Sequence, residues 1–243
     1  MAVSLSDPLL QAFLMVDTSL RVARSVRPAV DQYMKQWREC DSCRLARQRP
    51  CRTNTVHFRG YLPTDVAYIG EAPGDEEDLA GKPFVGPSGR CLEEIIEDVQ
   101  KREPHKALIC NVLGCIPRKN AIGEVRRPHP REVELCQPRL IHLLRIAQPK
   151  VIVLVGKTAK ESVPPLQFQQ FPSPQDVVKC QAEPQRWTAL TCHINHPAWL
   201  LRQGSSKQRI ERQRYVLRIA QTISRMKNNA RALSTEKRTD QDR

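Results

Sequence analysis

The order of apolar and polar residues predicts short buried strands that alternate with helices. Four apolar runs have the length of strands and lie at 66–69, 107–112, 151–155 and 188–194. Apolar residues recur at helical spacing over 88–99, 132–147 and 205–227. Strands that are apolar throughout are buried on both faces, as in parallel sheets covered by helices. We therefore predict an α/β fold, a three-layer α/β/α sandwich around a central, mainly parallel sheet of four strands.

The rest of the chain divides around this pattern. Residues 8–36 carry an imperfect helical pattern with Pro28 interrupting it, which predicts a helical extension over 1–36. We expect one domain over 37–227 and a basic, disordered tail over 228–243. Within the domain, 116–130 is a predicted basic loop with three prolines, and 163–176 is a predicted surface loop.

Polar residues follow three of the predicted strands, where parallel sheets bind their ligands. Glu71 follows the first strand, in a place where a carboxylate is poorly solvated and held in position. Asn111 ends the second strand and needs partners for its amide, either in a neighbouring loop or in a planar ligand such as a nucleobase edge. His196 follows the fourth strand and is either a structural imidazole or part of a site.

A glycine-rich loop over 81–89 carries Phe84 outside any strand or helix period. Glycines let a ligand approach the backbone closely, so Phe84 either plugs the loop onto the sheet or contacts that ligand. The acidic run at 75–78 is a predicted helix start, and Ser88 is placed to cap the next helix. Gly156-Lys157-Thr158 resembles the end of a phosphate-binding loop, but Val151 stands where that loop needs glycine, which excludes it.

Composition narrows the class of partner. The 243 residues hold 39 Lys and Arg against 26 Asp and Glu, and the net charge of +13 favours nucleic acid before an anionic membrane surface. The charge is uneven, because 70–98 holds nine acidic and only two basic side chains. No apolar run reaches the roughly 18 residues of a membrane span, and no signal peptide is visible. We expect a cytoplasmic protein without membrane contact.

The nine cysteines point to metal rather than to disulfides. Their number is odd, and the chain is long enough to fold without covalent staples. In a reducing compartment, Cys40-x2-Cys43 indicates metal binding or redox chemistry. Zinc ribbons use two such pairs, whereas scattered thiolates suit an iron–sulfur cluster at least as well. Spacing alone does not select the other ligands among Cys51, Cys91, Cys110, Cys115, Cys136, Cys180 and Cys192.

Three segments, in order, resemble the motifs of the family 4 uracil-DNA glycosylases. They are GEAPGDEED at 70–78 with GKPFVGPSG at 81–89, then Asn111-Val112 with Cys115, and finally His196-Pro197-Ala198. The resemblance extends over about 40–202. It implies a monomeric DNA glycosylase of base excision repair that hydrolyses the N-glycosidic bond of an extruded uracil and leaves an abasic site.

The resemblance also implies a role for each motif residue. Glu71 assists the attack of water on the sugar, and His196 hydrogen-bonds the base oxygen that gains charge. Phe84 stacks on the base, and Asn111 reads its edge. Glu77 lies near the 5-carbon of the ring, where it helps to reject thymine.

The resemblance also implies residues that complete the base pocket, contact DNA and hold a metal cluster. The base pocket is completed by Gly70 and Ala72. Contact with DNA is expected from Ser88, Trp199, Leu200, Leu201 and Arg202. A structural [4Fe–4S] cluster, pinning the basic loop, is implied at Cys40, Cys43, Cys115 and Cys136.

The chain departs from the family pattern in two places that bear on its substrate. The interval from Cys115 to Cys136 is longer, and Trp199 replaces a small residue beside the presumed wedge. These differences leave open a glycosylase for another modified pyrimidine, such as a bulky base in phage DNA. The charge and the cysteines alone also allow a non-catalytic iron–sulfur module that binds DNA.

Overall fold

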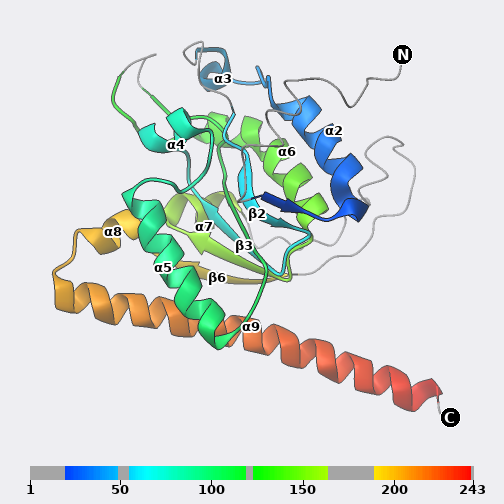
Figure 1. The fold of residues 1–243 in the computed structure, drawn as a ribbon. Coiled ribbons are helices and arrows are strands. Elements are labelled where there is room, and N and C mark those ends of the chain that lie inside the picture. Colours follow the sequence, from blue (N-terminus) through cyan, green and yellow to red (C-terminus); the bar gives the residue numbers. More distant parts are fainter. Residues whose placement is uncertain (1–19, 49–54, 119–122, 164–188, 242–243) are drawn as a thin grey trace, which may run out of the picture.

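A twisted sheet forms the centre of the molecule (Figure 1). The structure, a computed structural model, describes residues 20–48, 55–118, 123–163 and 189–241. In this part of the chain six strands pair in the order β1-β2-β4-β3-β5-β6. Their bounds are β1 Leu20–Val22, β2 Phe58–Leu62, β3 Val66–Gly70, β4 Ala107–Asn111, β5 Val151–Val155 and β6 Leu190–Ile194. The four predicted strands are β3 to β6, and all their mutual pairings are parallel.

The prediction of four strands was wrong by two. The additional strands are β1, which has three residues, and β2, with the sequence FRGYL, which pairs antiparallel with β4. Both lie on one side of the sheet, where a strand is less enclosed than in the centre. Their polar residues and glycine break the continuous apolar run by which the buried strands were found.

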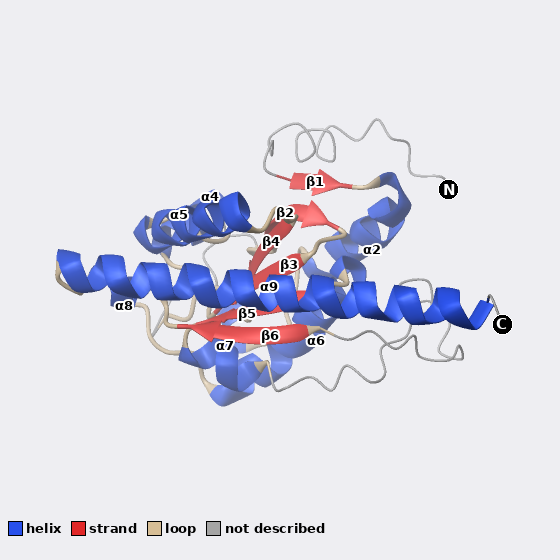
Figure 2. Cartoon of the chain, turned by 90° about the horizontal axis from the view of Figure 1, so that it is seen from below, coloured by secondary structure: helices blue, strands red, loops and turns tan. Residues whose placement is uncertain are grey.

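Helices cover both faces of the sheet and confirm the three-layer architecture (Figures 1 and 2). One face carries α5 (Pro87–Arg102), α8 (Pro197–Leu201) and α9 (Ser205–Gln241), and the other carries α2 (Arg27–Trp37), α6 (Pro130–Ala147) and α7 (Lys157–Ser162). Successive strand residues point to opposite faces, so Tyr68 packs with the first group and Ile69 with the second. Three short helices complete the described chain: η1 (Arg24–Val26), α3 (Arg44–Gln48) and α4 (Asp75–Ala80).

The two ends of the described chain differ from the expected extensions. Residues 20–22 form a strand rather than a helix, and Pro28 lies in the first turn of α2, where proline is tolerated. Tyr33 and Trp37 of this helix are buried against α6. Helix α9 continues to Gln241, well past the predicted limit at residue 227. Residues 1–19 and nearly all of the predicted loop at 163–176 lie outside the described residues.

No helix in the described ranges is both long and apolar enough to span a membrane. Helix α9 is the longest of the helices in Figure 2, but it is strongly basic, and only one side of it packs on the sheet and on α5.

Candidate active site

The carboxyl edge of the sheet gathers the residues that the sequence singled out. Glu71 follows β3, Asn111 ends β4 opposite Gly70, and His196 follows β6. Phe84 enters from the loop between α4 and α5, and its ring lies 6.1 Å from the His196 ring, centroid to centroid, at 31°. Parallel pairing therefore brings together groups that lie up to 125 residues apart in the sequence.

Asn111 presents a polar group that the protein leaves without a partner. The residue is 2% exposed, and its side-chain Oδ1 has no hydrogen-bond partner among the described residues. A buried acceptor without a donor is unfavourable by about 1–3 kcal/mol, so the position is suited to a ligand that supplies the donor.

Gly70 makes room for the Phe84 ring and the Asn111 amide at the end of β3. A Cβ at Gly70 would lie 2.4 Å from Cζ of Phe84 and 2.5 Å from Oδ1 of Asn111. Neither distance is compatible with a side chain, so only glycine lets the ring and the amide lie against this strand end. Ala72, two residues on, is half-buried and packs against the core on the α6 side.

His196 is held as a neutral hydrogen-bond donor. Its Nδ1 accepts a hydrogen bond from the backbone N–H of Ala198 at 3.2 Å, which caps α8. Burial lowers the pKa of His196, an effect that Glu71 opposes and Arg202 reinforces. The ring is therefore neutral at physiological pH, and because Nδ1 accepts, its proton resides on Nε2.

Glu71 receives a hydrogen bond from a residue that the sequence analysis had set aside. The Thr158 hydroxyl, at the start of α7, donates to Oε2 of Glu71. The backbone carbonyl of Glu71 accepts from Leu113 N–H at 3.0 Å, which joins the segments after β3 and β4. Thr158 belongs to the Gly-Lys-Thr tripeptide, so a hydroxyl following a strand was the signal that could have identified it.

Glu77 holds the motif loops together, and the N-cap of α5 is not the predicted residue. The two carboxylate oxygens of Glu77 accept backbone N–H groups from Gly74 at 3.0 Å and from Gly86 at 3.2 Å. Glu77 thus ties the start of α4 to the start of α5. Gly86, rather than Ser88, is the N-cap of α5, and the half-buried Ser88 lies in the first turn.

Helix α8 places its side chains on different sides, which corrects one prediction. Leu200 is fully buried in the core, so it is not available for contact with DNA. Leu201 is 42% exposed and is the apolar group that this turn presents to solvent, next to the exposed Arg202. Trp199 is half-buried, with the ammonium group of Lys207 5.6 Å from its ring centroid.

The four predicted cluster ligands come from three segments on the α6 side of the sheet. Cys43 and Cys115 are buried, and Cys40 and Cys136 pack against the same core. Burial raises the pKa of Cys43, and the nearby thiols of Cys136 and Cys40 raise it further. The three sulfur atoms therefore lie close enough to interact electrostatically. Within the ranges that the structure describes, no three such side chains form a ready metal-binding group.

The surroundings of Cys136 nevertheless fit a metal-bound thiolate. Its sulfur accepts hydrogen bonds from Gly114 N–H and from Arg139 Nε, both at 3.4 Å. Donors of this kind stabilise a thiolate. Of the other cysteines, Cys91, Cys110 and Cys192 are free and buried, and Cys51 and Cys180 lie outside the described residues.

Arg139 connects the cysteines with the strand that carries Asn111. This residue of α6 is 1% exposed, and its Nη2 donates to the backbone carbonyls of Asn111 at 2.7 Å and Val112 at 3.0 Å. Nη1 donates to the Tyr33 hydroxyl at 3.1 Å. Arg139 was not expected from the sequence, since a single arginine in an amphipathic helix is ordinarily exposed.

The basic loop is fixed at both of its described ends. Arg118 pairs with Asp75 of α4. Arg126 makes two hydrogen bonds to the Glu132 carboxylate, at 2.6 and 2.9 Å. Residues 119–122, in the middle of the loop, lie outside the described residues.

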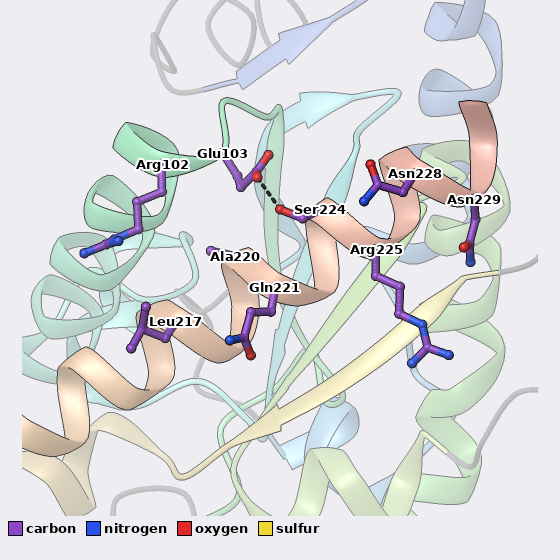
Figure 3. A pocket seen from close by; sticks show the side chains of 9 residues that line it. All are labelled: Arg102, Glu103, Leu217, Ala220, Gln221, Ser224, Arg225, Asn228 and Asn229. Atoms are coloured by element: carbon purple, nitrogen blue, oxygen red, sulfur yellow. Dashed lines mark hydrogen bonds between the residues drawn. The ribbon is translucent and has the colours of Figure 1, made fainter. Parts of the chain in front are cut away.

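A separate hollow lies between the end of α5 and the middle of α9 (Figure 3). It is lined by the end of α5, including Arg102 and Glu103, and by the middle of α9. Ser224 and Lys227 both bond to Glu103 there. None of the predicted site residues lines it, and α5 leads from the carboxyl edge to this end, so it is distinct from the candidate site.

Comparisons with known proteins agree with this geometry. A profile of the uracil DNA glycosylase superfamily matches residues 58–220, about two thirds of the chain. The type-4 uracil-DNA glycosylase of Archaeoglobus fulgidus is 34% identical over 72% of this chain and 85% of its own. That of Thermotoga maritima is 34% identical over 71% and 83%, and that of Sulfurisphaera tokodaii is 35% identical over 53% and 56%. From the motifs, the fold and these matches together, the chain belongs to the uracil DNA glycosylase superfamily.

Proposed function

We propose that the protein is a monofunctional DNA glycosylase that hydrolyses the N-glycosidic bond of a uracil extruded from DNA and leaves an abasic site. The observation that carries this proposal is the buried, unpartnered Oδ1 of Asn111 beside Phe84. Uracil offers an N–H donor next to a carbonyl acceptor, so one amide can satisfy both. Cytosine offers an acceptor and an amino donor at the same places, which the same orientation of the amide does not match.

The chemistry follows from the charges that develop as the bond breaks. A base must leave the stack before it can be attacked, and Phe84 then provides a surface for it to stack on. Positive charge grows on the sugar, where the Glu71 carboxylate stabilises it and orients water for attack. Negative charge grows on the carbonyl oxygen of the base, where neutral His196 donates a hydrogen bond from Nε2. No proton needs to leave the histidine for the bond to break.

We further propose that Cys40, Cys43, Cys115 and Cys136 hold a [4Fe–4S] cluster. Its four bonds to sulfur would fasten together the segment before α3, the segment after β4 and α6. The hydrogen bonds to Cys136 and the shared surroundings of Cys40 and Cys43 support this assignment. The four cysteines have a structural role in this proposal, and none of them takes part in the proposed cleavage of the glycosidic bond.

DNA is the proposed partner, in keeping with the charge of +13. Affinity is expected to fall steeply as salt rises, because contacts to phosphates release counterions.

The decisive experiment is cleavage of a uracil-containing oligonucleotide, with alkali used to break the strand at the abasic product. The wild-type protein is expected to produce a cut at the uracil, and Asn111→Ala is expected to abolish it. No cut by the wild type would refute the proposal, and release of a different modified pyrimidine in a parallel screen would replace uracil by that base. Iron analysis and the visible absorption spectrum of the same preparation test the cluster separately: a zinc-loaded, colourless protein with full activity excludes it.

A further inference from the structure

The backbone of Phe84 has a conformation that phenylalanine rarely adopts. Its φ is +55°, in the left-handed region that favours glycine. Among the described non-glycine residues, only Gln148 shares a positive φ, and Gln148 is the C-cap of α6, where this conformation is common. Phe84 lies in a loop and is 5% exposed. Its conformation therefore has to be imposed by neighbouring groups.

Arg59, the second residue of β2, supplies such a constraint. Its Nε donates to the Pro83 carbonyl at 2.8 Å, and its Nη2 donates to the Phe84 carbonyl at 2.9 Å. One planar guanidinium thus fixes two successive carbonyl groups relative to the sheet. The Arg59 side chain is only 13% exposed, so these bonds are shielded from water.

Helix α5 completes the clamp from the other side. Glu93 of this helix forms an ion pair with Nη1 of Arg59 at 2.7 Å, which orients the fork toward the loop. A Cβ at Gly89, in the first turn of α5, would lie 2.0 Å from the Phe84 carbonyl oxygen. The Phe84 peptide is therefore enclosed between β2 and α5, which restricts its φ.

We propose that Arg59 is a positioning residue for base recognition: it locks the Phe84 backbone so that the ring stands ready to stack on the extruded base. The inference rests on the proposed function, because it assigns Phe84 to stacking. Arg59 acts through the two carbonyls and touches neither the base nor the reacting bond. Lysine does not replace it, since a single ammonium group lacks the planar pair of donors.

The test is binding of the full chain to two oligonucleotides that differ at one nucleotide. One carries 2′-fluoro-2′-deoxyuridine, whose glycosidic bond resists cleavage, and the other carries a tetrahydrofuran abasic analogue. For Arg59→Met, we expect the Kd for the fluorouridine DNA to rise about 10-fold, equivalent to about 1.4 kcal/mol and within the range of a base stack. The Kd for the abasic DNA should stay within about twofold, because no base is present to stack.

Arg212→Met is the matched control. Arg212 of α9 also binds α5 through carboxylates, pairing with Glu94 and with Asp98 at 2.6 Å, and among the described residues its side-chain bonds go to α5 rather than to the loop. It is expected to lower thermal stability and leave both Kd values unchanged. Glu93→Gln is a milder second variant that keeps the two carbonyl bonds of Arg59, and it is expected to raise the fluorouridine Kd about threefold even if Arg59→Met does not fold.

Three results would overturn the inference: an unchanged fluorouridine Kd in the Arg59 and Glu93 variants, an equal loss on both DNAs, or the same loss in Arg212→Met. Failure of the proposed function is distinguishable, because the wild-type protein would then release no uracil and would not prefer fluorouridine DNA to abasic DNA. A wild type that is active alongside an unaffected Arg59→Met removes only the inference.

Discussion

Replacing Thr158 by valine removes one hydroxyl and almost no volume. In the structure this hydroxyl donates to Oε2 of Glu71, and the side chain is half-buried, so water only partly replaces it. A hydrogen bond to a charged group contributes about 1.5–3 kcal/mol. If the bond holds the carboxylate where the sugar becomes positive, its loss slows the chemical step about 10- to 100-fold, at about 1.4 kcal/mol per factor of ten.

Thr158 lies on the Glu71 side of the site and makes no contact with Asn111 or Phe84 in the hydrogen bonds and ring contacts of the described residues. The substitution is therefore expected to leave base binding intact. Single-turnover release of uracil measures the chemical step, and titration with fluorouridine DNA measures binding. The rate should fall while the Kd stays within about twofold, since the lost interaction acts on the transition state.

Thr158→Ser provides the matched control because it restores the donor. It should recover most of the rate, whereas Lys157→Met, which alters the exposed neighbour on the same helix, should leave the rate unchanged. A Thr158→Val protein that is as fast as the wild type would refute the role given to this hydroxyl. So would a serine variant that is as slow as the valine variant, because the defect would then arise from packing.

Three further predictions rest on other parts of the site. The rate of uracil release should fall as the pH drops below the lowered pKa of His196. Protonation of Nδ1 breaks its hydrogen bond with the Ala198 N–H and ends the neutral state that burial favours. A rate that rises with acid in single-turnover assays would contradict this. Arg139→Met should lower the free energy of unfolding by about 3 kcal/mol in urea titrations, because it leaves two buried carbonyls without their donor. A loss below about 1 kcal/mol would contradict the contacts described. Leu201→Ala should lower activity on double-stranded uracil DNA more than on single-stranded uracil DNA and leave the stability unchanged, whereas Leu200→Ala should destabilise the fold by about 2–5 kcal/mol. The reverse pattern would refute the assignment of the two leucines.

The central strands could be predicted from the sequence because burial on both faces leaves a simple signal. Strands β3 to β5 are almost entirely apolar and buried along their whole length, whereas β6, the edge strand LTCHI, is partly exposed; all four lie where they were expected. Strand β2 carries Arg59 and Gly60 and shows no such run, so neither the strand nor its role beside the loop could be foreseen.

The same division applies to the candidate site. Glu71, Asn111 and His196 could be proposed because each follows or ends a recognisable strand, and Phe84 because it stands in a motif. Arg59, Thr158 and Arg139 each donate a hydrogen bond to a group at least 25 residues away in the chain, and no local pattern marks such a donor. Leucines 200 and 201 were not separated because the sequence did not reveal α8, whose turn sends neighbours in different directions.

The contact between Arg139 and the Asn111 carbonyl has a consequence for how base preference can change. The main chain of Asn111 is anchored from α6, whereas its side-chain oxygen has no hydrogen-bond partner among the described residues. The structural contact of this position is thus made by backbone atoms common to every amino acid, whereas the proposed recognition of the base uses side-chain atoms that a substitution replaces. Substitutions here are free to alter the preferred base while the supporting strand keeps its place. Evolution or protein engineering can therefore change the base preference through this side chain without changing the residues that support the strand.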